Sequence, residues 1–137
     1  MGILNLFGRN NKGQNPEKTP IYQIFTEWVP YKLYANKKSS SKLNIKIKNM
    51  TNDAALTSIF ISLPNQLSFD NMGLEKDKIM KLGEIQPHEE KNASIDVMTN
   101  LNSESGEYTI VLTATSHYRD YDHVVNSIKK STTVQVV

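Results

Sequence analysis

The chain has 137 residues, with 16 basic and 14 acidic side chains, a formal net charge of +2 and no cysteine. This length suits one domain with an unaided hydrophobic core, and the lack of cysteine excludes disulfides and thiolate metal sites. The mild charge gives no reason to expect nucleic acid as a partner. No apolar run approaches the ~20 residues of a membrane-spanning helix, and the cysteine-free composition suits a reducing, cytoplasmic compartment.

Residues 1–20 are expected to form a flexible N-terminal tail and residues 21–137 the folded domain. The polar stretch 8–20 (GRNNKGQNPEKTP) has the composition of a linker. Ahead of it, Ile3, Leu6 and Phe7 stand at helical spacing, so one helical turn would present a small apolar face. A segment this short binds a membrane surface only weakly, and peripheral membrane contact through the tail is kept as an alternative. The layout of a signal peptide is missing, so export is not expected.

The first segment of the predicted domain, residues 21–34 (IYQIFTEWVPYKLY), carries aromatic residues at a spacing of three. A short helix from Thr19-Pro20 to Val29 is one interpretation. Extended structure with a kink at Pro30 is favoured, because proline is tolerated at sheet edges. Most of the rings are expected in the core, with an exposed ledge for a sugar or a peptide as the alternative. The rings are those of Tyr22, Phe25, Trp28, Tyr31 and Tyr34.

Alternating apolar and polar residues predict strands through the rest of the chain. Residues 43–48 and 57–63 are the first two, and residues 78–82 and 93–97 are expected to be middle strands at which the chain switches sheets. Residues 106–115 are expected to be the longest strand, paired with residues 130–137. The residues expected to face inward are Leu43, Ile45, Ile47, Ile59, Ile61, Leu63, Ala93, Ile95, Val97, Tyr108, Ile110, Leu112 and Ala114. About seven strands and no convincing long helix indicate an all-β, antiparallel sandwich of two sheets.

Outward positions carry polar residues in this scheme. Ser58 and Ser62 are expected to face solvent. Six lysines lie between residues 32 and 48 with no acid among them, which would form an electropositive patch. The favoured interpretation is that Lys46 and Lys48 are simply the outward residues of one strand, at an edge where lysine discourages aggregation.

Four stretches resemble bacterial and archaeal immunoglobulin-like modules of the fibronectin type III and cell-adhesion kind, over residues 30–137. Residues 42–49 (KLNIKIKN) resemble their second strand, which ends in asparagine, and residues 63–69 (LPNQLSF) resemble the turn after the third. Residues 82–90 (LGEIQPHEE) resemble an "LG, apolar, PGE" connection with His88 in place of glycine, and residues 106–110 (GEYTI) resemble the start of a core strand. The resemblance implies an immunoglobulin-like β-sandwich with a scaffold or recognition role.

Two residues of these stretches have specific expected roles. Tyr108 is expected to bury its ring and to aim its hydroxyl at the preceding loop, as in a tyrosine corner. Asn49 begins an Asn-Met-Thr glycosylation sequon, but it is interpreted as a strand-end residue.

The best candidate site is a loop between the last two strands that is dense in imidazole, carboxylate and phenol groups. Tyrosine and arginine are enriched at interface hot spots, so a protein partner is expected here. Two histidines and an aspartate would also suit zinc, but their spacing matches no recognised zinc pattern, and no metal or cofactor is expected. A solvated hairpin connection is the plainer alternative. The candidate residues are His117, Tyr118, Arg119, Asp120, Tyr121, Asp122 and His123.

Signals for catalysis are missing from the sequence. There is no G-x-S-x-G turn and no phosphate-binding glycine-rich loop, and Glu89-Glu90 lies in a polar turn where carboxylates are solvated. The only basic and aromatic cluster, around residues 31–38, is a weak match to nucleic-acid binding. The sequence therefore predicts a non-enzymatic protein-interaction or structural module. The alternative is a ligand-binding module for carbohydrate or a metal ion.

Overall fold

The computed structural model describes residues 20–137, so the predicted tail, with Ile3, Leu6 and Phe7, lies outside the described residues except for Pro20. Eight strands make up the described part, and none of its residues forms a helix that is long and apolar enough to cross a membrane. The strands are β1 (Tyr22–Val29), β2 (Lys32–Leu33), β3 (Ser39–Asn49), β4 (Ala55–Ser62), β5 (Asp77–Ile85), β6 (Glu90–Thr99), β7 (Gly106–His117) and β8 (Val124–Val136).

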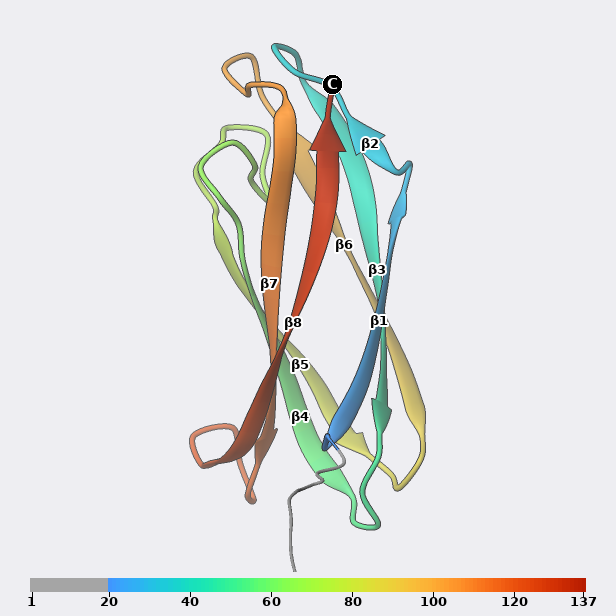
Figure 1. Cartoon of the computed structure of the whole chain (residues 1–137). Coiled ribbons are helices and arrows are strands. Elements are labelled where there is room, and N and C mark those ends of the chain that lie inside the picture. The colour runs from blue at the N-terminus through green and yellow to red at the C-terminus, as the bar shows by residue number, and fades with distance from the viewer. Residues whose placement is uncertain (1–19) are drawn as a thin grey trace, which may run out of the picture.

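The strands form two sheets that face each other (Figure 1). One sheet has the order β1-β3-β6 and the other the order β2-β8-β7-β4-β5. All neighbours are antiparallel except β2 and β8, which run parallel. The chain crosses between the sheets at β1–β2, β2–β3, β3–β4, β5–β6 and β6–β7. The predicted all-β, immunoglobulin-like antiparallel sandwich is therefore confirmed.

The first predicted strand is split, which brings the number of strands to eight. β1 belongs to the three-stranded sheet, and β2 pairs with the end of β8 in the other sheet. Pro30, which has no N–H to donate to a ladder, lies between them and follows a cis peptide bond. The expected kink at Pro30 is confirmed.

The spacing of the aromatic residues was interpreted wrongly. Tyr22 is buried, with 2% of its surface exposed, and Trp28 is partly buried, but Phe25, Tyr31 and Tyr34 are exposed. A spacing of three sends successive residues to opposite faces of a strand, whose period is two. Most of these rings therefore lie outside the core.

The central strands follow the predicted alternation. Leu43, Ile45 and Ile47 are at most 1% exposed, and they face the buried Ile59, Ile61, Ile110 and Leu112 of the opposite sheet across the core. The expectation that Lys46 and Lys48 mark an edge was wrong, because β3 is the middle strand of its sheet. Outward residues of middle and edge strands both meet solvent, so alternation does not distinguish the two.

The last hairpin is longer than predicted. β8 begins at Val124, not at residue 130, and its 13 residues exceed the 12 of β7. Residues 124–131 are almost all exposed, so they show no alternation that a sequence pattern would reveal. The backbone ladder with β7 defines the strand there.

The predicted tyrosine corner is confirmed. The Tyr108 hydroxyl donates to the carbonyl of Glu104 at 2.8 Å, and its ring packs against the core. At the opposite end of the sandwich, Asn49 ends β3 as predicted. Its buried amide donates to the carbonyls of Asp53 (2.7 Å) and Ile85 (2.9 Å), and its Oδ1 accepts from the N–H and the hydroxyl of Thr51. Asn49 thus ties the β3–β4 turn to the end of β5.

We expect Asn49→Ala to lower the free energy of unfolding by about 3 kcal/mol, because two carbonyls and one N–H lose their buried partner. Urea unfolding followed by the fluorescence of Trp28 measures this loss. Asn92→Ala, at an exposed position of β6, is the control and should change stability by less than about 0.5 kcal/mol. Equal effects of the two substitutions would contradict the role of Asn49.

The conformation of the turn at residues 86–89 explains why the modules that this chain resembles have glycine at the position of His88. The N–H of Glu89 donates to the carbonyl of Gln86 at 3.0 Å, and His88 has φ of +62°. Proline at the second position and a positive φ at the third define a type II turn, whose third position favours glycine. His88 adopts the same turn at a steric cost.

We expect His88→Gly to raise the free energy of unfolding by about 0.5–1 kcal/mol, because glycine has no Cβ to clash at positive φ. Lys38→Gly, at a loop residue outside the positive-φ set, is the control and should lower stability. Urea unfolding of both variants tests the turn, and a loss of stability in His88→Gly would contradict it.

Candidate functional site

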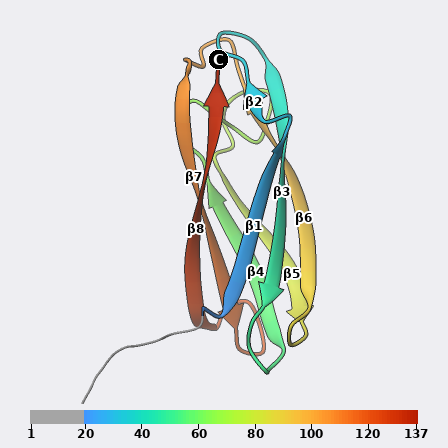
Figure 2. The ribbon, with the colours of Figure 1, turned by 45° about the vertical axis from the view of Figure 1, so that its right-hand side comes forward.

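The predicted site lies at one end of the sandwich. The strand directions bring four segments together there, residues 20–21, 50–54, 86–89 and 118–123, at the bottom of Figures 1 and 2. We call this the hairpin end, after the β7–β8 hairpin whose loop is residues 118–123. The seven predicted residues divide here into two groups, one that packs against the sheet and one that faces solvent.

His117 belongs to the packed group. It ends β7, and its Nε2 lies 2.7 Å from the hydroxyl of Ser58 on the neighbouring strand β4. Ser58 was expected to face solvent, but only 8% of its surface is exposed. The sequence does not reveal this pair, because 59 residues separate its members. Only the pairing of β4 with β7 brings them together.

A serine hydroxyl at hydrogen-bonding distance from an imidazole also resembles a nucleophile with its base. Such a pair needs a third group to orient the base. Within residues 20–137, the Nδ1 of His117 has no hydrogen-bond partner. Ser58 is buried, and the ring of Tyr121 packs edge-on against His117 at 5.1 Å. The pair is therefore a hydrogen bond between neighbouring strands that lacks the third group of such an arrangement within residues 20–137.

Tyr121 is also packed, because it completes an irregular part of the sheet. The β4–β5 register shifts so that Thr57 faces Gly83 while Ser58 faces Lys81, which leaves one extra residue in β5. Gly83 has φ of +76° at this bulge, and its N–H donates to the Tyr121 hydroxyl at 2.9 Å. The Lys81 ammonium lies 5.1 Å from the centre of the Tyr121 ring. Tyr121 thus anchors the loop to β5.

The solvent-facing group lies at the tip of the loop. Tyr118 is 58% exposed, and the guanidinium of Arg119 lies 5.1 Å from the centre of its ring. Asp120 accepts hydrogen bonds from the N–H of Asp122 (3.0 Å) and from Nδ1 of His123 (2.7 Å). The bond with His123 is the main cause that lowers the pKa of Asp120.

That shift makes the turn sensitive to acid. Because the folded carboxyl has a lower pKa than the unfolded one, its contribution to stability is present above the unfolded value, near 3.8. The contribution is lost as the pH falls through the folded value.

Two further exposed residues adjoin the tip. Val124 and Val125 begin β8, and both are 65% exposed. They were not among the predicted site residues. The residues around them do not alternate between apolar and polar, so no strand was predicted there. Together with Tyr118 they give the hairpin an apolar surface.

Beside the hairpin lies a groove of about 500 Å³. Its apolar walls include Ile21, Ala54, Ala55 and Val125, and its remaining lining comes from Tyr22, Asn49, Thr51, Asp53, Ser116, His117, Tyr118 and Asn126. These residues come from the start of β1, the β3–β4 turn and the hairpin. No sequence pattern predicted the groove, since it depends on how these three parts of the chain meet.

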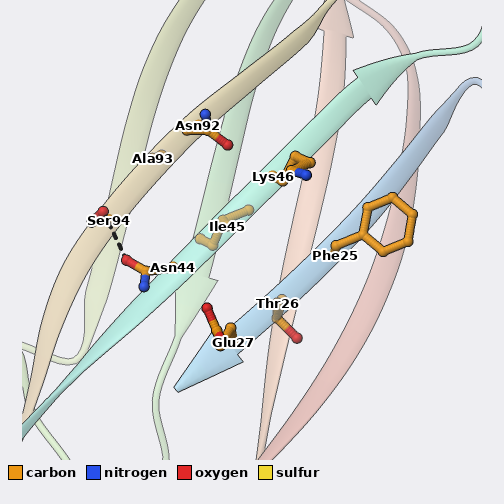
Figure 3. Close-up of a pocket in the computed structure, with 9 residues that line it drawn as sticks. All are labelled: Phe25, Thr26, Glu27, Asn44, Ile45, Lys46, Asn92, Ala93 and Ser94. Atoms are coloured by element: carbon orange, nitrogen blue, oxygen red, sulfur yellow. Dashed lines mark hydrogen bonds between the residues drawn. The ribbon is translucent and has the colours of Figure 1, made fainter. Parts of the chain in front are cut away.

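A second depression crosses the outer face of the three-stranded sheet (Figure 3). The exposed ring of Phe25 stands at one side, and Asn92 and Ser94 of β6 at the other, with Lys46 and Asn44 of β3 between. The Ser94 hydroxyl donates to Asn44 Oδ1 at 3.0 Å. This face has one aromatic ring among polar groups. Tyr31 and Tyr34, the other exposed rings of the 21–34 segment, do not line it.

The residues considered for zinc do not converge. Asp120 and His123 pair in the loop, whereas His117 bonds to Ser58 on the sheet. Among residues 20–137, no group of three or more His, Cys, Asp or Glu side chains is arranged to hold a metal ion.

Comparisons with known proteins support the fold alone. No protein-family model matches the chain, and no curated protein matches it in sequence. A FixG-related protein from Vibrio parahaemolyticus is similar in structure, with a TM-score of 0.56 and 12% identity over 86% of this chain and 98% of that one. Part of E. coli alpha-2-macroglobulin is also similar (TM-score 0.55, 16% identity, 83% of this chain and 6% of that one).

A third similar structure is the Pseudomonas fluorescens alkylpurine DNA glycosylase AlkC, bound to DNA that contains an abasic site analog. Its TM-score is 0.50 at 7% identity, over 85% of this chain and 30% of that one. The chain thus matches one protein over almost its whole length and small parts of two larger ones. At such low identities these similarities carry no function.

We expect Tyr121→Phe to lower the free energy of unfolding by about 1 kcal/mol, because the N–H of Gly83 loses its acceptor. The amide proton of Gly83 should also exchange faster with solvent, as measured by nuclear magnetic resonance. Tyr118→Phe, which removes the hydroxyl of a tyrosine at the exposed tip, should change neither quantity. A Gly83 amide that exchanges equally in both variants would show that the loop is not anchored there.

Proposed function

We propose that this chain is a non-enzymatic protein-interaction module that contacts a protein partner through its hairpin end. The observation that carries the proposal is that some residues of the hairpin pack against the sheet while others face solvent. Tyr121 and His117 are committed to the sheet, while Tyr118 and Arg119 face solvent beside two exposed valines. An anchored loop loses little conformational freedom on binding, which favours affinity.

The chemistry of the tip suits a protein surface. Tyrosine and arginine are the residue types that dominate interface hot spots. Stacking of the guanidinium on the ring holds both side chains in one arrangement. The apolar Val124 and Val125 add contact area at the base of the tip.

The absence of catalysis is part of the same proposal. The described residues offer one serine–histidine contact, and its serine is buried. The finer family assignment is also proposed, as a bacterial or archaeal module of the fibronectin type III or cell-adhesion kind. Its support is the asparagine at the end of β3, the turn at His88 and the corner formed by Tyr108. A cytoplasmic location, with no nucleic-acid partner, completes the proposal.

A photo-crosslinking amino acid in place of Tyr118 tests the contact surface. Irradiation in the cells that produce the protein should join the chain to one defined partner. The same substitution at Tyr31, which is 72% exposed and far from the hairpin end, is the matched control and should not capture that partner. Mass spectrometry identifies the adducts.

The partner found in this way is then purified and titrated against two variants. Tyr118→Ser should weaken binding about tenfold or more, as expected for a hot-spot residue. Tyr31→Ser should leave the affinity unchanged. A partner whose affinity depends on Tyr31 and not on Tyr118 would contradict the proposed surface, and so would capture from Tyr31 alone.

A further inference from the structure

The groove at the hairpin end lies at the point where the undescribed part of the chain joins the domain. Pro20 is the first described residue, and Ile21 already lines the groove. Any segment that precedes residue 20 therefore starts at the groove's rim. No other surface of the domain is as close in sequence to residues 1–19.

The chain carries an apolar segment of its own at the far end of that stretch. Five of the first seven residues are apolar, namely Met1, Ile3, Leu4, Leu6 and Phe7. The thirteen residues that follow, 8–20, are polar. A linker of this length and composition has an r.m.s. end-to-end distance of about 20 Å, so the segment stays within reach of the hairpin end.

The groove fits such a segment in size and chemistry. Its volume of about 500 Å³ lies in the range of sites that bind small ligands or a few side chains. Four of its twelve lining residues are aliphatic, and one of these, Val125, is 65% exposed. Asp53 also lines it, whereas the linker is basic, with Arg9, Lys12 and Lys18 against Glu17.

We propose that residues 1–7 of this chain dock in the groove between Ile21, Ala54, Ala55 and Val125. The short linker makes the contact intramolecular, at an effective concentration on the order of millimolar. A contact whose intrinsic dissociation constant is about millimolar is therefore enough to fill the groove half of the time. Leu6 and Phe7, next to the linker, supply the apolar contact.

Docking in this way gives the tail a role within the domain. The segment covers the wall of the groove that Val125 provides, next to the hairpin tip. It involves no other molecule and is tested without the partner proposed above, but the two contacts share Val125 and therefore compete for it.

The absence of cysteine allows a direct test in the full chain. Asn5→Cys creates a single attachment point for a nitroxide spin label. In the ¹⁵N-labelled protein, the nitroxide should broaden the amide signals of Ala54, Ala55 and Val125 relative to its reduced form. The signals of Asn36 and Leu101, at the opposite end, should keep their intensity.

One double variant and one pair of single variants separate docking from mere proximity. Leu6→Asp with Phe7→Asp keeps the label and the linker but removes the apolar side chains, and should abolish most of the broadening. Val125→Asp should do the same from the side of the groove. Val124→Asp is its matched control, since Val124 is equally exposed but does not line the groove, and should leave the broadening intact.

Three outcomes would overturn the proposal. Equal broadening with and without Leu6 and Phe7 would mean that the tail is near the groove but not in it. Broadening centred on Phe25 and Asn92 would place the segment on the other sheet. Broadening of ¹⁵N-labelled, unmodified protein mixed with spin-labelled, unlabelled protein would assign the contact to a second copy of the chain.

Discussion

The whole molecule depends on the apposition of two aliphatic sheet faces. Leu43, Ile45 and Ile47 of β3 are buried against the aliphatic side chains of β4 and β7. Each such side chain contributes about 1.5–3 kcal/mol when it is fully withdrawn from water. No disulfide supplements this packing, so the ends and the open side of the sandwich are closed by hydrogen bonds. Asn49 closes the hairpin end, and the corner formed by Tyr108 closes the other.

At the open side between β1 and β8, a single polar side chain of β8 links the two sheets. These strands lie next to each other but belong to different sheets (Figure 2). The hydroxyl of Thr132 in β8 accepts both the indole N–H of Trp28 (3.0 Å) and the hydroxyl of Thr26 (3.1 Å) in β1. One threonine therefore links the sheets where no ladder does. The only tryptophan in the sequence thus has its polar atom satisfied at the rim of the core.

Much of the fold could be predicted from the sequence, because a period of two identifies which residues share a face. The inward sets of β3, β4 and β7, the kink at Pro30 and the roles of Asn49 and Tyr108 all follow from local patterns or from resemblance. The bounds of β8 could not be predicted in this way. Its first half is exposed on both faces and is held by backbone pairing, which leaves no trace in hydropathy.

The candidate site was predictable only as a loop of suggestive composition. Which of its residues are free depends on contacts across strands, and those contacts join residues far apart in the chain. Ser58 and His117 meet through the β4–β7 ladder, and Gly83 meets Tyr121 over a separation of 38 residues. The groove has the same origin, since segments from the start, middle and end of the domain line it.

The bond between Tyr121 and Gly83 also couples the loop to the border of the five-stranded sheet. β5 is the outermost strand there, and its bulge leaves one amide that the loop satisfies. A molecule that lifted the loop would strip this amide of its acceptor and release the irregular end of β5. The position of the loop and the order of the end of β5 are therefore coupled, so a change in one alters the other.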